Sequence, residues 1–469
     1  MSAQQSNPCF ADLMKLRSGD LPQRASVRLE NSDPVIRSRF RVGEAAASAL
    51  AAGAVAADDI LRLRNGDGDP QQISVDKRIA VASLRGYKFM RIEGSRQLVA
   101  NYTLPTSGFY CCRDGRFIHL QGAFPHLREG TLELLGCGDT IKEVSTKIAQ
   151  RDSFELEEAL AESGLCGAVI RSEKEWMAHP QGQAISTVPV IEIIKIADGE
   201  PQPLPAAARP LDGVRVLDLT RVLAGPVSGR TLAAHGADVL HVRSPKLPSM
   251  EIFVAETNQG KFSTFLDLTR AEDATRLREL AAETDIFVQG YRGGAMDARG
   301  FGPNALAHLR PGIIYVSLNC YGHSGPWAQR PGWEQLAQSV SGLAEEGGRP
   351  GGPQLVPAAP CDYTTGYLAA CGAMMALTRR LREGGSYHVR LSLSRTAMWI
   401  LAQSRCSVDE VEKAAADVEK IDVQSAMTVS DTPFGRLHHI DPIICMSATQ
   451  PYWIRPSVPL GTHAPQWPS

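Results

Sequence analysis

The stretch Val214-Arg-Val-Leu-Asp-Leu219 and the turn that follows it, Thr220-Arg-Val-Leu-Ala-Gly-Pro226, decide the fold of this chain. The first reads as a short apolar strand, and the second opens a helix over residues 225–237. Strands and helices then alternate, with strands at 238–242, 285–289 and 312–318 and helices at 270–284 and 304–309. This alternation is typical of a doubly wound parallel sheet, so we predict an α/β fold with a large Rossmann-like domain.

The loops at one edge of this sheet are the expected place for a ligand. In doubly wound sheets, ligands bind beyond the carboxyl ends of the strands, in the loops that follow them. Here those loops are residues 220–226, 291–294 and 319–326. We therefore expect the functional site where these three loops meet.

The composition is that of a globular protein. Of 469 residues, 43% are hydrophobic and 21% are charged, with a net charge of -2. This balance argues against nucleic acid or an acidic membrane surface as a partner. No apolar run approaches the roughly 18 residues that span a bilayer, and the first residues lack the pattern of a secretory signal. The ten cysteines form no CxxC pair. They favour reduced thiols in a cytoplasmic protein, and we predict no metal centre.

A proline-rich segment divides the chain near residue 205. Residues 197–210 contain four prolines and are typical of an extended linker. We assign residues 1–205 to a first part, 206–405 to the Rossmann-like domain, and 406–469 to a C-terminal tail that wraps around the rest. The first part is predicted to hold a smaller α+β domain, with helices at 44–64, 139–150 and 153–164, a strand at 73–75, and a hairpin at 110–120 that turns at Asp114-Gly115.

Two segments of the chain resemble each other. Residues 53–64, a turn and residues 73–76 repeat the pattern of residues 372–382, a Gly-Gly turn and residues 389–392. Alignment through the two helices places Gly43 opposite Asp362, so the first copy lacks a carboxylate at that position. The alternative is chance similarity, because Ala-rich helices share composition easily.

Asp362 is the charged residue that stands out in the second copy. It lies in Val356-Pro-Ala-Ala-Pro-Cys-Asp-Tyr-Thr-Thr-Gly366, directly before a long apolar helix that reaches Leu381. Backbone N–H groups and the helix dipole stabilise a carboxylate at such an N-terminus. Asp362 is thus either a helix cap or a carboxylate placed for chemistry, and its position alone fits both.

Six motifs in the second half carry a resemblance to a known family. The first is Leu211-Asp-Gly-Val-Arg-Val-Leu-Asp-Leu-Thr-Arg-Val-Leu-Ala-Gly-Pro226. The others follow in order, at residues 258–268, 282–294, 310–318, 321–327 and 330–342. With these motifs the chain resembles the family III CoA-transferases, the CaiB/BaiF group that includes formyl-CoA transferase and α-methylacyl-CoA racemase. The resemblance covers most of residues 40–401 in permuted order, as in a fused tandem whose first copy is truncated.

The resemblance implies the family III CoA-transferase fold and an acyl-CoA:carboxylate CoA-transferase whose nucleophile is Asp362. Its carboxylate would form a mixed anhydride with the acyl group and then an aspartyl-CoA thioester. Backbone N–H groups of Ala224 and Gly225 would stabilise the oxyanions. Coenzyme A and its acyl thioester enter as substrates, with a small carboxylic acid as the second partner, and no permanently bound cofactor is implied.

The same resemblance places CoA over the strand-end loops. Arg221, Lys261 and Arg292 match family positions near the nucleotide and would bind its phosphates, while two tyrosines would pack on adenine or pantetheine. The implied CoA-binding positions are Arg221, Val222, Leu223, Asn258, Lys261, Tyr291, Arg292 and Tyr321. The alternative is that the loop cations are solvated surface and the tyrosines belong to the core.

Three positions depart from the family pattern. Leu223 stands where formyl-CoA transferase has a glutamine, His241-Val-Arg-Ser-Pro245 lacks the usual Lys-x-Glu, and Trp333 stands where the racemases have a histidine. Racemisation needs an acid/base group on each face of the substrate, so an acyl-CoA racemase or isomerase is the second hypothesis. The third is a non-catalytic CoA-binding partner subunit. Whether one chain completes a site or needs a homodimer stays open.

Overall fold

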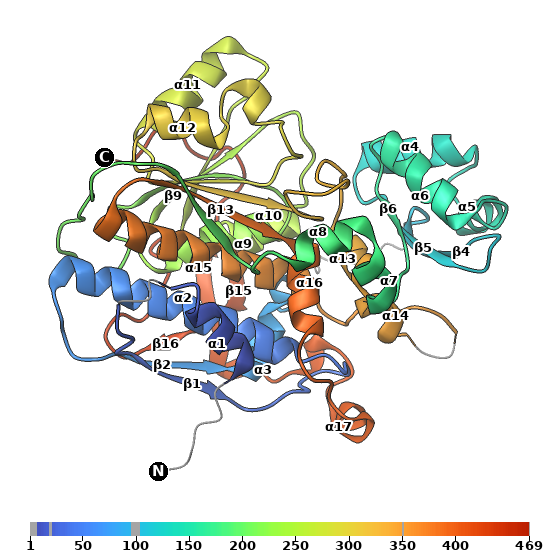
Figure 1. The fold of residues 1–469 in the computed structure, drawn as a ribbon, viewed down its shortest axis with the longest axis horizontal. Coiled ribbons are helices and arrows are strands. Elements are labelled where there is room, and N and C mark those ends of the chain that lie inside the picture. The colour runs from blue at the N-terminus through green and yellow to red at the C-terminus, as the bar shows by residue number, and fades with distance from the viewer. Residues whose placement is uncertain (1–6, 18–20, 95–103, 349–350, 469) are drawn as a thin grey trace.

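The computed structural model describes residues 7–17, 21–94, 104–348 and 351–468 (Figure 1). Its centre is a seven-stranded sheet in the order β10-β9-β8-β11-β12-β13-β7. These strands are β7 (Glu192–Ala197), β8 (Arg215–Leu219), β9 (Asp238–Arg243), β10 (Lys261–Phe265), β11 (Ile286–Gln289), β12 (Ile314–Asn319) and β13 (Ser386–Ser392). Neighbours in the sheet are parallel, except that β7 is antiparallel to β13. The predicted doubly wound parallel sheet is confirmed.

The topological switch point of this sheet lies at β8. The chain runs outward from β8 to β9 and β10, and then returns to β11 on the other side of β8. The loops after β8 and β11 therefore diverge and leave a crevice at the carboxyl ends of the strands. The strand β10 was not expected from the sequence, which placed Lys261 in a loop.

Helices cover both faces of the sheet. On one face, α11 and α12 pack over a core that contains Leu277 and Phe287, and on the other face α9 and α15 pack over the main core. Strands buried on both faces are apolar at nearly every position, which is why they stand out in the sequence. The helices of this half are α9 (Ala224–Ala234), α10 (Glu251–Thr257), α11 (Ala271–Ala282), α12 (Pro303–Leu309), α13 (Glu334–Ser341), α14 (Leu343–Glu346), α15 (Pro360–Glu383) and α16 (Leu393–Leu401), with the short turn η2 (Asp297–Arg299).

The predicted internal repeat corresponds to two helices that pack against each other, α2 (Val42–Asn65) and α15 (Figure 1). Both have 24 residues and end before a glycine, Gly66 or Gly384, in a similar backbone conformation. A strand and a helix follow each: β2 (Gln72–Asp76) and α3 (Lys77–Ser83) after α2, β13 and α16 after α15.

The helix ends correct the alignment of the two copies by one residue. The third residue of α15 is Asp362, and the third residue of α2 is Glu44. The predicted pairing of Gly43 with Asp362 is therefore wrong. That alignment matched Gly53 with Gly372, but matching the first and last residues of the two helices shifts the alignment by one residue and pairs Glu44 with Asp362.

The N-terminal and C-terminal segments of the chain lie together. Strands β1 and β2 form a sheet with β16, and β14 and β15 form another with β3. Beyond these strands the tail is extended and reaches β10, where the backbone N–H of His463 donates to Ser263. The elements of these segments are α1 (Pro8–Met14), β1 (Ser26–Glu30), η1 (Gly86–Lys88), β3 (Arg91–Ile92), α17 (Val408–Lys413), η3 (Val418–Lys420), η4 (Gln424–Ala426), β14 (Met427–Thr432), β15 (Gly435–Ile440) and β16 (Cys445–Met446).

A smaller α+β domain lies beside the main body (Figure 1). It contains β4 (Ser107–Cys111), β5 (Phe117–Gln121), α4 (Pro125–Leu135), α5 (Ile141–Ile148), α6 (Ser153–Glu162), β6 (Gly167–Val169), α7 (Glu173–Ala178) and α8 (Pro180–Ser186). The predicted hairpin is present as β4 and β5, with Gly115 at φ 79° in its turn. Residues 1–205 do not form one body, because α2 packs on α15 and β7 joins the large sheet.

Among the helices of the described residues, none has the length and apolar character that a transmembrane segment requires. The expectation of no secretory signal concerns the start of the chain, and residues 1–6 lie outside the described residues.

Candidate active site

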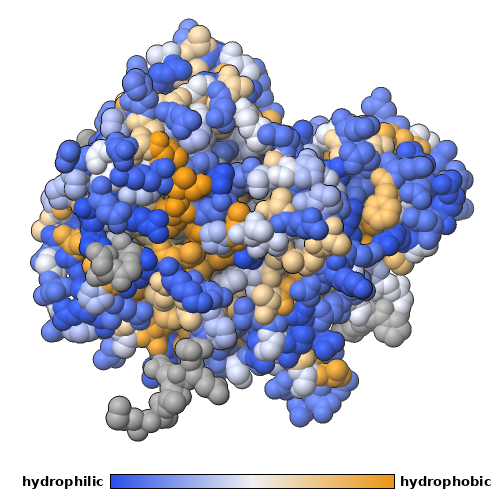
Figure 2. All heavy atoms as spheres, viewed as in Figure 1, coloured by the Kyte–Doolittle hydropathy of each residue, from blue (hydrophilic) through white to orange (hydrophobic). Residues whose placement is uncertain are grey.

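A cavity of about 590 Å³ opens at the switch point of the sheet. The loops after β8, β9 and β11 line it from the Rossmann-like domain, and the small domain lines it through Phe124, His126, Leu127 and Cys166. The first residues of α13 and α15 complete it with Glu334 and Asp362. In the space-filling view the surface is hollowed between the small domain and the lobe that carries α11 and α12 (Figure 2).

The turn between β8 and α9 has an unusual backbone. Val222 has a φ of 67°, and α9 begins two residues later at Ala224. Gly225 lies against Thr220, because a Cβ at position 225 would come within 2.3 Å of the Thr220 Cβ. The first N–H groups of a helix have no partner inside it. Those of Ala224 and Gly225 therefore have no partner within α9, and their role as oxyanion donors stays a prediction.

Asp362 lies in the first turn of α15, and the side chain of Glu334 lies next to it. Glu334 accepts hydrogen bonds from the backbone N–H groups of Cys361, at 3.3 Å, and Asp362, at 2.5 Å. The side-chain amide of Gln338 donates a third, at 2.7 Å. The helix N–H groups expected to stabilise the Asp362 carboxylate donate to Glu334 instead, because α13 brings a second carboxylate to the same helix end.

This arrangement raises the proton affinity of Asp362. Burial, and then the charge of Glu334, raise the pKa of the Asp362 carboxyl well above its ordinary value. Burial also raises the pKa of Glu334, but Gln338 and the two backbone donors act in the opposite direction. Of the two carboxyl groups, Glu334 therefore has the donors that stabilise a negative charge, and Asp362 has the burial and the neighbouring charge that raise its pKa.

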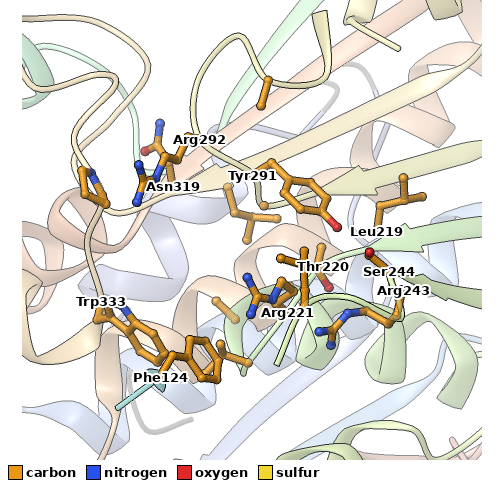
Figure 3. Close-up of a pocket in the computed structure, with 18 of the residues that line it drawn as sticks. Phe124, Leu219, Thr220, Arg221, Arg243, Ser244, Tyr291, Arg292, Asn319 and Trp333 are labelled. Carbon is orange, nitrogen blue, oxygen red and sulfur yellow. The ribbon is translucent and has the colours of Figure 1, made fainter. Parts of the chain in front are cut away.

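Cationic side chains surround the rest of the cavity: Arg221, Arg243, Lys246, Arg292, Arg299 and Arg330. In Figure 3, Arg221 lies between Phe124 and Arg243, and Tyr291 lies above both arginines. Burial, and then Arg221, lower the pKa of Arg243 to about 10. The Arg243 side chain still titrates far above neutral pH, so it remains charged.

Three contacts hold the small domain over the cavity. The Arg221 guanidinium lies 4.8 Å from the centre of the Phe124 ring. Arg292 donates to the backbone carbonyl of Gly164 at 2.8 Å. Arg330 pairs with Glu158 at 2.5 Å. Two predicted CoA-binding arginines therefore also contact the small domain.

Lys261 lies elsewhere than predicted. It is the first residue of β10, its side chain is 0% exposed, and its ammonium donates to Asp218 at 2.7 Å and to the Pro226 carbonyl at 2.8 Å. The family motif that drew attention to it therefore marks a buried structural ion pair. A fully buried and fully bonded ammonium does not reach a phosphate, so the predicted role is wrong.

Two further predicted CoA-binding residues lie outside the cavity. Asn258 is buried, contacts His241 at 2.7 Å and donates to the Val458 carbonyl at 2.8 Å. Tyr321 is 1% exposed and packs edge-on against Trp327. Both belong to the packing that supports the loops, whereas the predicted residues Arg221, Val222, Leu223, Tyr291 and Arg292 line the cavity.

Sequence reasoning missed several residues of the cavity wall. Glu334, Arg243 and His126 were not among the predicted site residues, and each comes from a different part of the chain. The sequence held one signal for Arg243. At residues 241–245 the chain departs from Lys-x-Glu, and Arg243 puts a positive charge where that motif has the negative charge of glutamate. Trp333, which stands at the position of the racemase histidine, packs edge-on against Phe124 with ring centres 5.2 Å apart.

No cluster of three or more histidine, cysteine, aspartate or glutamate side chains capable of holding a metal ion is found in the described part of the chain.

Comparison with known proteins agrees with this geometry. Residues 211–435 match the family model described as CoA-transferase family III. An acetyl-coenzyme A transferase of Hypoxylon pulicicidum is 33% identical over 63% of this chain and 54% of its own length. The succinyl-CoA:glutarate CoA-transferase of Homo sapiens is 34% identical over 42% of this chain and 48% of its own length.

Among solved structures, the chain is similar to a hypothetical protein from Mycobacterium tuberculosis. The two are 32% identical with a TM-score of 0.40, and the match covers 42% of this chain and 57% of that one. The chain thus spans about half the length of the curated relatives it matches.

The buried ion pair gives the first prediction. Lys261→Met should lower the free energy of unfolding by about 3–5 kcal/mol, because it leaves the Asp218 carboxylate buried without a partner. Denaturant titration measures this loss. The double variant with Asp218→Asn should recover part of it. A Lys261→Met variant that unfolds at the same denaturant concentration as the parent would contradict the structural assignment.

Proposed function

We propose that this chain is an acyl-CoA:carboxylate CoA-transferase in which Asp362 is the nucleophile. The observation that carries the proposal is the position of Asp362: it lies at a buried helix N-terminus and lines the same cavity as the first turn of α9 and several arginines. A carboxylate, oxyanion donors and phosphate-binding cations are the three groups that CoA transfer between acids requires.

The first half of the reaction forms two covalent intermediates. The Asp362 carboxylate attacks the carbonyl carbon of the acyl thioester, the C–S bond breaks, and a mixed anhydride and CoA thiolate result. The thiolate then attacks the aspartyl carbonyl of the anhydride. This step releases the donor acid as a carboxylate and leaves an aspartyl-CoA thioester. No proton is gained or lost in either step.

The second half repeats these steps in reverse order with the acceptor acid. The acceptor carboxylate attacks the aspartyl thioester and forms a second anhydride and CoA thiolate. The thiolate attacks the acceptor's acyl carbon, the new acyl-CoA forms, and Asp362 leaves as a carboxylate. Each attack passes through a tetrahedral oxyanion, and we assign its stabilisation to the N–H groups of Ala224 and Gly225.

The environment of Asp362 suits a nucleophile that must avoid water. A buried carboxylate is poorly hydrated and hence more reactive once ionised, and its raised pKa is the cost of that burial. The small domain covers the cavity through Phe124 and Leu127, which limits the access of water to the anhydride and thioester. Arg221 lies in the same turn as Ala224 and is the arginine we place closest to the reacting end of CoA.

Proton exchange at the acyl α-carbon is the second candidate function, and His126 is the observation in its favour. This histidine lines the cavity together with Asp362. Burial, and then Arg221 and Arg292, lower its pKa, so it is available as a neutral base. Labelled CoA exchange that depends on an added acid supports transfer, solvent deuterium at the α-carbon supports racemisation, and the absence of both supports a non-catalytic CoA-binding subunit.

The nucleophile is tested by Asp362→Asn. The amide keeps the size of the side chain but does not attack a thioester, so acid-dependent CoA transfer should fall by at least about a thousandfold. The variant should unfold at the same or a higher temperature than the parent at neutral pH, because it removes a carboxyl group that is destabilised by burial. Hydroxylamine should modify Asp362 only in the presence of acyl-CoA. Transfer activity within tenfold of the parent would rule out this role.

The pH dependence of transfer tests the carboxylate pair. Asp362 reacts when deprotonated and its pKa is raised, so activity should be lost as pH falls through a value above the ordinary carboxylate range. Glu334→Gln removes the neighbouring negative charge and lowers the pKa of Asp362. The loss of activity on the acidic side of the pH profile, its acidic limb, should therefore shift to lower pH. Gln338→Leu is the matched control: it removes a donor to Glu334 without removing charge, so it should not produce this shift to lower pH. A limb unchanged in Glu334→Gln would contradict the coupling.

The stoichiometry of trapping tests the first copy. Glu44 stands at the position of Asp362 in the repeat, but its carboxylate pairs with the Lys77 ammonium at 2.5 Å. An ion-paired carboxylate is a weak nucleophile, so we expect one aspartyl adduct per 469-residue chain, on Asp362. Mass spectrometry after hydroxylamine trapping counts the adducts. A second adduct on Glu44 would show that both copies react.

A further inference from the structure

Arg243 is a buried arginine that has few hydrogen-bond partners in the described part of the chain. It is the last residue of β9 and is 2% exposed. Its Nε and Nη2 atoms have no hydrogen-bond partner among the described residues, and no carboxylate forms an ion pair with it there. Each of the other five cations that line the cavity either is more exposed than Arg243 or pairs with a carboxylate. Lys246, for example, is mostly exposed and pairs with Asp267 at 2.7 Å.

An unpaired cation in this position calls for an anion from outside the chain. Burying a charge without a partner is costly, so such groups are retained where a ligand completes them. Among its neighbours, Arg221 is also a cation and Tyr291 is neutral. The charge of Asp218 also acts on Arg243, but that carboxylate is already paired with Lys261 at 2.7 Å. Both arginines line the cavity, so the missing anion belongs to the molecule that occupies it.

The place of Arg243 in the sheet indicates which anion this is. The order β10-β9-β8-β11-β12-β13 is the order 3-2-1-4-5-6 of the dinucleotide-binding folds. In those folds the end of the second strand contacts the ribose of the nucleotide, and an arginine there accommodates a phosphate on that ribose. The second strand here is β9, and Arg243 is its last residue.

We propose that Arg243 binds the phosphate on the 3′-hydroxyl of the CoA ribose, with Ser244 and Lys246 beside it. This inference rests on the proposed function, because it takes CoA as the occupant of the cavity. The proposal also explains why residues 241–245 depart from Lys-x-Glu: a glutamate at position 243 would repel a phosphate.

This assignment also sets the direction of CoA in the cavity. The ribose phosphate lies at the end of β9, and the pantetheine arm runs across the loop after β8 towards Asp362. Arg221 lies between Arg243 and Phe124 in Figure 3, so it is placed to contact the diphosphate between the two ends of the molecule. The two arginines therefore recognise different phosphates of one ligand.

Calorimetric titration with CoA and with dephospho-CoA, which lacks the 3′-phosphate, separates these roles. The parent protein should bind CoA about tenfold to a hundredfold more tightly than dephospho-CoA, the difference expected for a charge-assisted hydrogen bond. Arg243→Met should weaken CoA to the level of dephospho-CoA and leave dephospho-CoA within about twofold. Arg243→Lys should keep part of the discrimination. Arg221→Met is the control, and it should weaken both ligands by the same factor.

Three results would overturn the proposal: equal affinity of the parent for the two ligands, equal weakening of both by Arg243→Met, or no binding of CoA. Arg243→Met removes an unpaired buried charge, so it should melt no lower than the parent without ligand, and circular dichroism checks its fold. If that variant does not fold, the comparison of the two ligands on the parent still decides. Discrimination by a protein that performs no CoA transfer would keep this inference and refute the proposed reaction.

Discussion

The ion pair between Asp218 and Lys261 is the constraint on which the site depends. It joins β8 to β10 across the sheet, and the lysine also holds the Pro226 carbonyl in the first turn of α9. Asp218 in turn accepts a hydrogen bond from Thr220, against which Gly225 lies. The buried charges of Asp218 and Lys261 therefore fix the shape of the turn after β8 and the direction of its N–H groups. A charge so deeply buried acts by fixing geometry.

The sequence predicted those parts of the fold that a local pattern of residues determines. The apolar runs at β8, β9, β11 and β12 and the glycine-proline turn are recognisable because strands buried on both faces need apolar residues throughout. Lys261 was misplaced for the converse reason: a lysine reads as surface, and only its partner Asp218, 43 residues earlier, makes it internal. Glu334 was missed because its importance lies in reaching the end of another helix, a contact between distant residues that no periodicity encodes.

The cavity separates two kinds of charge. At one end Glu334 and Asp362 crowd two carboxyl groups together, which favours a proton on one of them. At the other, Arg221 and Arg243 crowd two cations together, which favours an anion between or beside them. A ligand with phosphates at one end and a thioester at the other matches both: its phosphates satisfy the arginines, and its uncharged thioester approaches the carboxyl pair without repulsion.

The repeated helices begin with the same geometry but place the carboxyl group of their third residue in different surroundings. Asp33 accepts hydrogen bonds from the N–H groups of Gly43 and Glu44, just as Glu334 accepts them from the corresponding residues of α15. The copies differ in what faces the third residue of the helix. Lys77 neutralises Glu44, whereas Asp362 faces the cavity and no lysine pairs with it in the described part of the chain. Capping is thus common to both copies, and we expect reactivity to depend on whether the helix end meets a cation or an open cavity.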